Sequence, residues 1–208
     1  MSEQSYITIA GRAVAEIVEK KSRFIASVAH VETEEEALAF IDEIKAANRM
    51  ARHNVYAYVI REGGRVRYTD DGEPQKTAGM PTLEVITHAG LTDIVVVTTR
   101  YFGGVLLGTG GLVRAYTAAA QAGIQAAERV TVSRCVEVRV VLPYSLYEQA
   151  VRIAEDCEAN VVQSDFADEV TLVFRMLEKS QEALVVRLTE LTRGQANITC
   201  IEPFDAVF

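Results

Sequence analysis

Five glycines lie within nine positions of the sequence, directly before a long alanine-rich stretch: Gly103, Gly104, Gly108, Gly110 and Gly111. Glycine lets backbone N–H groups approach a ligand closely. The start of a helix adds free N–H groups and the positive end of the helix dipole. Arg100 and Arg114 flank the run with guanidinium groups that suit phosphate or carboxylate. The pattern predicts an anion-binding site, with a tight, purely structural strand-to-helix turn as the alternative.

The established nucleotide-binding motifs do not match this glycine run. No lysine follows the glycines as it would in G-x-x-x-x-G-K-[ST], and Val113 stands where the third glycine of G-x-G-x-x-G belongs. The sequence alone therefore does not say which anion would bind.

A second candidate is the acidic loop Asp70-Asp71-Gly72-Glu73-Pro74. Its three carboxylates, together with His53 on the edge of the preceding strand, could hold Mg²⁺ or divide the roles of general acid and base. Aspartate also favours turns, because it bonds its own backbone. A turn without chemistry is therefore the alternative, and the sequence favours it.

No arrangement for nucleophilic catalysis stands out. The chain has only three histidines, no G-x-S-x-G segment and no cysteine beside a histidine. Thr77, Thr98, Thr99 and Thr109 would each need an activating base, and the sequence identifies none. We therefore predict no catalytic residue, no metal and no cofactor.

Aromatic and arginine residues alternate through the same region. The aromatic residues are Tyr56, Tyr58, Tyr68, Tyr101, Phe102 and Tyr116, and the arginines are Arg52, Arg65, Arg67, Arg100 and Arg114. Such a mixture suits single-stranded nucleic acid and equally suits the centre of a protein interface. Strand alternation places about half of these aromatic side chains in the core.

Charge is distributed unevenly along the chain. The net charge is −8, and residues 135–208 contribute −7 of it, from 13 acidic and 6 basic residues. The second part should therefore repel phosphate. The first part can still present a local basic surface.

The bulk composition predicts a cytoplasmic protein that does not span a membrane. No apolar run approaches the roughly 20 residues of a membrane-spanning helix, and the N-terminus lacks the features of a signal peptide. The three cysteines, Cys135, Cys157 and Cys200, have no metal-type spacing and are expected to be reduced thiols.

The elements that must position these residues follow from periodicity and turn signals. In the first part we expect strands at 5–10, 13–18, 21–30, 54–60, 65–69 and 93–99, and helices after Thr33, from Pro81 to Gly90 and from about Leu112 to Ala127. Thr33 and Glu36 form a capping box, and Ala37, Leu38, Phe40, Ile41 and Ile44 form the apolar stripe of that helix.

The pattern of residues 135–208 predicts a simpler order of elements. Strands at 136–142, 160–164, 169–176 and 197–201 alternate with helices at 146–157 and 181–191, giving β-α-β-β-α-β, the ferredoxin-like order. The return of strand periodicity at Cys135 places the domain boundary between residues 134 and 135. We thus expect an α+β protein with domains 1–134 and 135–208.

At this point the residues resemble the YigZ/IMPACT family, bacterial two-domain type. The resemblance covers about residues 18–127 and includes these motifs: Lys21-Ser22-Arg23-Phe24-Ile25, His53-Asn54-x-Tyr56-Ala57-Tyr58, Asp70-Asp71-Gly72-Glu73-Pro74, Thr77-Ala78-Gly79-x-Pro81, Thr99-Arg100-Tyr101-Phe102-Gly103-Gly104 and Leu107-Gly108-x-Gly110-Gly111-Leu112-Val113-Arg114-Ala115-Tyr116. One departure is visible, because the family usually has Ser-Gly where this chain has Gln75-Lys76. That change removes a glycine from the acidic loop and adds a positive charge beside its three carboxylates.

The resemblance implies an N-terminal domain with the fold of the second domain of ribosomal protein S5, and a C-terminal ferredoxin-like domain similar to those of elongation factor G. It also implies a link to translation, because the eukaryotic relatives regulate translation by binding the activator of a stress kinase. We therefore expect a non-enzymatic protein that binds RNA or a ribosome-associated protein, in an oligomeric state that the sequence does not give.

The contacts are expected from Arg100, Tyr101, the glycine run and Arg114, with His53, Thr77 and the acidic loop forming the rim. Two alternatives stay open. One is a Mg²⁺-dependent enzyme that acts on a small phosphorylated metabolite or nucleotide, with carboxylates of the acidic loop as ligands. The other is an adaptor that contacts only proteins, in which the glycines are structural.

Overall fold

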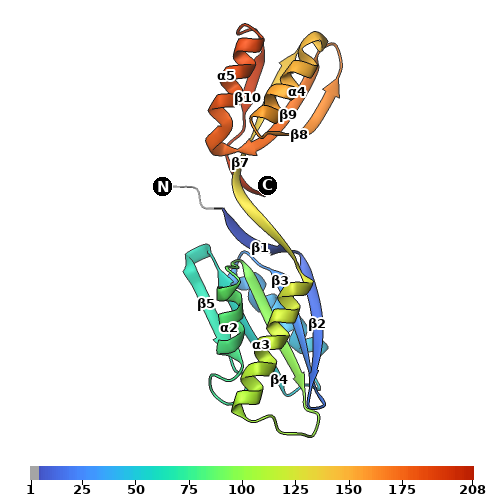
Figure 1. The fold of residues 1–208 in the computed structure, drawn as a ribbon, viewed down its shortest axis with the longest axis vertical. Coiled ribbons are helices and arrows are strands. Elements are labelled where there is room, and N and C mark those ends of the chain that lie inside the picture. The colour runs from blue at the N-terminus through green and yellow to red at the C-terminus, as the bar shows by residue number, and fades with distance from the viewer. Residues whose placement is uncertain (1–4) are drawn as a thin grey trace. The chain divides into compact units, whose positions relative to one another are not determined.

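The computed structural model describes residues 5–208, and in it the chain divides into two compact units. The first unit is Tyr6–Val130, and the second is built from Thr131–Phe208. Figure 1 shows both units, and each is described here by itself. Among the described residues, no helix has the length and apolar character needed to cross a lipid bilayer.

The first unit is built on a five-stranded antiparallel sheet. Its strands, in spatial order, are β2 (Arg12–Glu19), β3 (Ser22–His30), β6 (Ile94–Tyr101), β4 (His53–Ile60) and β5 (Arg65–Thr69). The other elements are β1 (Tyr6–Ala10), α1 (Glu34–Ala47), the short 3-10 turn Glu62–Gly64, α2 (Gly79–His88) and α3 (Thr109–Ala126). The helices α2 and α3 lie on one face of the sheet and α1 lies on the other.

The central strand β6 shows why the sheet needs helices on both faces. Val95 and Val97 pack against α1, whereas Ile94 and Val96 pack toward α2 and α3. All four side chains are fully buried, as the continuous apolar run of this strand predicts.

Helix α1 begins as its capping residues predict. The Thr33 hydroxyl accepts a hydrogen bond from the Glu36 backbone N–H at 3.2 Å. The Glu36 carboxylate accepts from the backbone N–H of Glu32, one residue earlier than the usual capping box. The predicted apolar stripe is wrong at Leu38, which is 46% exposed, because the buried face of the helix is centred on Phe40 and Ile41.

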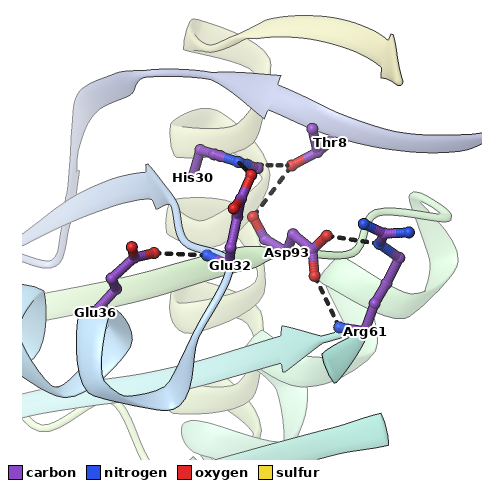
Figure 2. A network of polar contacts seen from close by, with 6 residues as sticks. All are labelled: Thr8, His30, Glu32, Glu36, Arg61 and Asp93. Atoms are coloured by element: carbon purple, nitrogen blue, oxygen red, sulfur yellow. Dashed lines mark hydrogen bonds and ion pairs between the residues drawn. The ribbon is translucent and has the colours of Figure 1, made fainter. Parts of the chain in front are cut away.

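A polar network holds the end of the first unit at which β6 begins. The buried Asp93 carboxylate accepts hydrogen bonds at 2.7 Å from both the backbone N–H and the Nε–H of Arg61. Thr8 donates to the Asp93 carbonyl oxygen at 3.1 Å and is bonded to His30 Nδ1 at 2.9 Å (Figure 2). This network joins β1, β3 and the start of β6. The predicted site residues Arg100 and Tyr101 lie at the opposite end of β6, so this network serves the fold.

The second unit has the predicted β-α-β-β-α-β order, followed by one further strand. Its elements are β7 (Glu128–Leu142), the 3-10 turn Tyr144–Leu146, α4 (Tyr147–Asp156), β8 (Asn160–Phe166), β9 (Val170–Leu177), the 3-10 turn Glu178–Ser180, α5 (Gln181–Leu191), β10 (Asn197–Cys200) and β11 (Phe204–Val207). The pairings β7–β9, β9–β8, β10–β7 and β11–β7 are all antiparallel. One face of this sheet packs with α4 and α5 around the core residues Phe174, Leu184 and Leu188.

Candidate functional site

The predicted site residues gather at one end of the first unit, which we call the loop end. It consists of the β2–β3 turn (20–21), the α1–β4 loop (48–52), the β5–α2 loop (70–78) and the β6–α3 loop (102–108). The strand register brings them together, because Arg23 pairs with Tyr101 and His53 pairs with Arg100. Figure 1 shows the loops before α2 and α3 at this same end.

Arg100 lies inside the loop end in a buried ion pair. Its Nη1 donates to Glu73 Oε1 at 2.7 Å, and the two side chains are only 8% and 4% exposed. The Tyr116 hydroxyl of α3 donates to the same carboxylate oxygen at 2.8 Å. Burial, reinforced by the Glu73 charge, raises the pKa of Tyr116 above its ordinary value. The expectation that Arg100 and Arg114 both present a free guanidinium to one anion is therefore wrong for Arg100.

Asp70 acts as the N-terminal cap of α2. Its Oδ1 accepts hydrogen bonds from the backbone N–H groups of Ala78 and Gly79 at 3.0 and 2.8 Å, and its Oδ2 accepts from that of Lys76 at 2.8 Å. A carboxylate at this position satisfies free helix donors and the positive end of the dipole. The α2 N-terminus is thus occupied by the chain's own anion.

The remaining polar residues of the acidic loop are also bonded internally. Asp71 Oδ2 accepts from the Asn54 backbone N–H at 2.6 Å, and His53 Nδ1 donates to the Asp71 carbonyl oxygen at 2.8 Å. Thr77 Oγ1 donates to the Pro74 carbonyl oxygen at 2.6 Å. Within residues 5–208, no three histidine, cysteine or acidic side chains form a metal-binding group. The arrangement supports a structural loop and does not favour the Mg²⁺ alternative.

The departure at Gln75-Lys76 is accommodated in an unusual way. Lys76 has a φ of 61°, in the left-handed region that favours glycine, the residue that the family resemblance leads us to expect there. Its backbone N–H still reaches Asp70, so the turn closes despite the lysine side chain. The substitution therefore places an exposed cation on the loop.

The glycines have different roles. A Cβ on Gly103 would lie 2.0 Å from the Lys21 carbonyl, so only glycine allows this approach, and its N–H donates to Ser22 Oγ at 3.1 Å. Gly104 and Gly108 have φ values of 86° and 71° and turn the chain into α3. Gly110 and Gly111 form the first turn of that helix, and Gly110 is exposed.

The N-terminus of α3 differs from that of α2. Gly108 provides no side-chain cap, and the first turn contains no acidic residue. A cavity of about 200 Å³ beside it is lined in part by Lys20, Leu107, Gly111 and Arg114. Two cations and the exposed Glu19 carboxylate thus line the cavity at this helix start, and no side chain among residues 5–208 caps its backbone donors.

Tyr101 does not line this cavity and instead braces the neighbouring loop. Its hydroxyl donates to Asn48 Oδ1 at 2.8 Å, and the Arg23 guanidinium lies 5.7 Å from the ring centroid. Arg23 is in turn paired with Glu16 at 2.7 Å. We therefore assign Tyr101 a positioning role for the α1–β4 loop.

Six exposed cations lie on the loop end and at the start of α3, and the sequence patterns do not group them: Lys20 and Arg49 belong to none of those patterns, and no single pattern contains the other four. The six are Lys20, Lys21, Arg49, Arg52, Lys76 and Arg114. None of them forms a salt bridge within the described part of the chain. Phe102, at 53% exposure, and Leu106, at 82%, lie on the β6–α3 loop among them. The missing signal is topological, because these residues are distant in sequence and meet only through the sheet register.

The fold and this end surface define a class: a two-domain α+β protein with antiparallel sheets, whose first domain collects its loops and free cations at one end. Residues 20–124 match the Impact N-terminal domain, and residues 140–195 match a domain of unknown function, DUF1949. The chain belongs to the IMPACT family.

The relatives support this membership over most of the chain. The IMPACT family member YvyE of Bacillus subtilis is 36% identical over 198 residues, which cover 93% of this chain and 90% of the relative. The Protein IMPACT homolog of Dictyostelium discoideum is 37% identical over 97 residues, which cover 44% of this chain and 28% of that protein. A crystal structure described as a hypothetical protein has a TM-score of 0.62 and 29% identity, covering 97% of this chain and 99% of that chain.

Proposed function

We propose that this protein is a non-enzymatic binding protein linked to translation, and that it contacts RNA through the loop end of its first unit. One observation carries the proposal: six exposed cations without internal ion-pair partners in the described chain lie on the loop end and at the start of α3, together with an exposed aromatic side chain, Phe102. Cations neutralise backbone phosphates, and an exposed aromatic ring offers a surface on which a base can stack.

The internal bonding of the acidic loop is what makes the loop end attractive to RNA. The carboxylates of Asp70, Asp71 and Glu73 accept hydrogen bonds from backbone N–H groups or from Arg100 and Tyr116. These donors offset much of the negative charge that the sequence places there. The free lysines and arginines therefore dominate the local field, although the whole chain has a net charge of −8.

Family membership supports the link to translation, and the sequence supports a cytoplasmic location. We infer that the first unit has the fold of the second domain of ribosomal protein S5, and that residues 135–208 form a ferredoxin-like domain. A ribosome-associated protein is the other partner that the loop end could bind, because arginine and aromatic residues also suit protein interfaces.

The test is an RNA titration across salt, with ribosome co-sedimentation beside it. Fluorescently labelled poly-uridine RNA is titrated with the full chain from about 50 to 200 mM KCl, where binding through phosphates weakens steeply. Arg114→Ala and Lys21→Ala should each weaken binding and lower the salt slope by about one for each phosphate that is no longer neutralised. Arg129→Ala is the matched control, since Arg129 is exposed just beyond the far end of α3.

Three outcomes separate the possibilities. Binding that falls with Arg114→Ala and not with Arg129→Ala supports RNA recognition at the loop end. Ribosome binding that survives nuclease treatment and still depends on Arg114 would replace RNA with a protein partner. No binding to RNA or ribosomes at low salt would overturn the proposal.

A further inference from the structure

Strand β8 forms an open edge of the sheet in the second unit. It pairs with β9 on one side, and within residues 5–208 no strand pairs with its other side. All seven of its residues are exposed. They include Val161 and Val162, each 43% exposed, and Phe166, 54% exposed. An edge of this kind leaves a row of backbone N–H and C=O groups free to pair with another extended chain.

The usual protections of an edge strand are weak here. The segment Asn160–Phe166 contains no lysine and no proline, and Asp165 is its only charged residue. A bulge interrupts the ladder at Val162. Beyond it, Gln163–Phe166 pairs regularly with β9, so four consecutive residues offer an uninterrupted edge.

The charge around β8 is entirely of one sign in the sequence. Residues 155–169 contain six acids and no basic residue: Glu155, Asp156, Glu158, Asp165, Asp168 and Glu169. Within the described residues, Asp156 pairs with Arg187 at 2.7 Å, and the other five form no ion pair. Unlike the acidic loop of the first unit, this edge keeps its negative charge uncompensated.

Aromatic rings lie at the far end of the same strand. Phe166 contacts Tyr144 and Tyr147, with ring centroids 6.2 and 5.5 Å apart. Tyr144 is 53% exposed, and its hydroxyl fixes it to the Ala167 carbonyl oxygen at 2.7 Å. Exposed rings beside carboxylates form a favourable environment for a guanidinium or ammonium group.

We propose that β8 binds an extended, lysine- and arginine-rich segment of a partner protein, which adds to the sheet as a further strand. The free edge would supply the main-chain hydrogen bonds, and the exposed valines would contact alternate side chains of the segment. The flanking carboxylates and the Phe166–Tyr144 pair would select its basic residues. This site is separate from the loop end and goes beyond the proposed RNA binding.

The charge argues against the other occupants. Nucleic acid would place phosphates beside five uncompensated carboxylates. A second copy of the chain would bring the same acidic edge, with residues 135–208 at a net charge of −7, against itself. A basic extended segment is the occupant that satisfies both the free backbone edge and the surrounding charge.

The test uses the full chain and a synthetic octapeptide that alternates valine with lysine or arginine. A second peptide of equal charge has proline in place of each valine, so it loses the backbone N–H at every second position and its fixed φ fits a strand poorly. We expect the first peptide to bind and to slow amide hydrogen exchange at Gln163–Phe166. We also expect the proline peptide to bind more weakly. Equal affinity for both peptides, or unchanged exchange at β8 under saturation, would overturn the proposal.

Charge variants provide a second measurement, which changes one exposed side chain and leaves the backbone edge of β8 available. Asp165→Lys should weaken binding of the valine peptide about threefold to fivefold, the effect of one exposed charge pair. Glu190→Lys makes the same charge change at an exposed site on α5 and should have little effect. Equal losses in the two variants would indicate attraction to net charge alone and would contradict a site at β8.

Discussion

Glu73 connects three elements of the first unit through one carboxylate. It lies on the β5–α2 loop and accepts hydrogen bonds from Arg100 on β6 and Tyr116 on α3, all within the buried part of the loop end. This group of atoms therefore fixes the position of the acidic loop and keeps the Glu73 carboxylate away from the surface. A residue that the sequence presents as a candidate for chemistry becomes part of the interior.

Because Arg100 is in a buried ion pair and Arg114 is exposed, we expect substitutions of these two arginines to change the free energy of unfolding by very different amounts. Arg100→Met leaves the Glu73 charge buried without its partner, so we expect the free energy of unfolding to fall by about 3–5 kcal/mol. Arg114→Met, at an exposed position on α3, should change it by less than about 0.5 kcal/mol. Urea denaturation of both variants measures the difference. Equal stability of the two would show that the Arg100–Glu73 pair contributes nothing to the fold.

The raised pKa of Tyr58 predicts how the free energy of unfolding depends on pH in the alkaline range. Burial, followed by its hydrogen bond to the Glu34 carboxylate and the Glu34 charge, raises the pKa of Tyr58 to about 12. An unfolded tyrosine has a pKa of about 10. The folded state thus favours the neutral hydroxyl, and this contribution is complete below about pH 10 and is lost as the pH rises toward 12.

The corresponding measurement is the urea midpoint between about pH 9 and pH 12 for the wild type and for Tyr58→Phe. The wild type should lose more stability over this window than the variant, because the variant has no hydroxyl to ionise there. Tyr116 is raised in the same direction and is present in both proteins, so the comparison isolates Tyr58. Parallel pH profiles would contradict the assignment.

At the scale of elements, the β2–β3 turn combines an unfavourable backbone with an exposed charge. Lys20 and Lys21 have φ values of 46° and 67°, a pair of positive angles that asparagine and glycine adopt far more readily. Both lysines are exposed at the loop end, and Gly103 packs directly on the Lys21 carbonyl. Strained residues that persist at a binding surface are consistent with a functional use of the side chains.

The double substitution Lys20→Asn with Lys21→Gly separates these two aspects. It should raise the free energy of unfolding by roughly 1 kcal/mol or more, because the left-handed conformation is disfavoured by about 1–2 kcal/mol per ordinary residue. It should also weaken RNA binding, because two cations are removed. Thermal unfolding and the RNA titration are measured on the same preparation. A more stable variant with unchanged RNA affinity would remove this turn from the binding surface.

The elements are largely predictable from local signals, and the site is not. Thr33 and Glu36 indicate the start of α1, and the apolar run at Ile94–Val97 indicates a strand buried on both faces, because both features depend on neighbouring residues. The pairing of Arg100 with Glu73 joins residues on different elements and depends on how the acidic loop folds back over β6. The prediction that Leu38 is buried fails for a related reason, since helical spacing alone does not show where the covered face ends.

At the scale of the whole molecule, the two units divide the charge between them. The first unit bonds the carboxylates of its acidic loop internally and exposes cations, whereas five of the six carboxylates near the edge of the second unit form no ion pair within the described residues. RNA and a basic protein segment are opposite in charge, so each should be rejected by the unit that accepts the other. One chain could then hold both ligands at once without competition between them.

Dissection of the chain between Val130 and Thr131, where the two compact units meet in the sequence, tests this division. A fragment of residues 1–130 should bind RNA with the same dependence on Arg114 as the full chain, and a fragment of residues 131–208, which keeps the residues that pair with β11, should bind the valine-containing basic peptide and no RNA. Circular dichroism and cooperative urea unfolding first establish that each fragment is folded. In the full chain, saturating peptide should leave the RNA affinity unchanged. If peptide instead displaces RNA, both ligands use one surface, and the separation of charge between the units does not separate their functions.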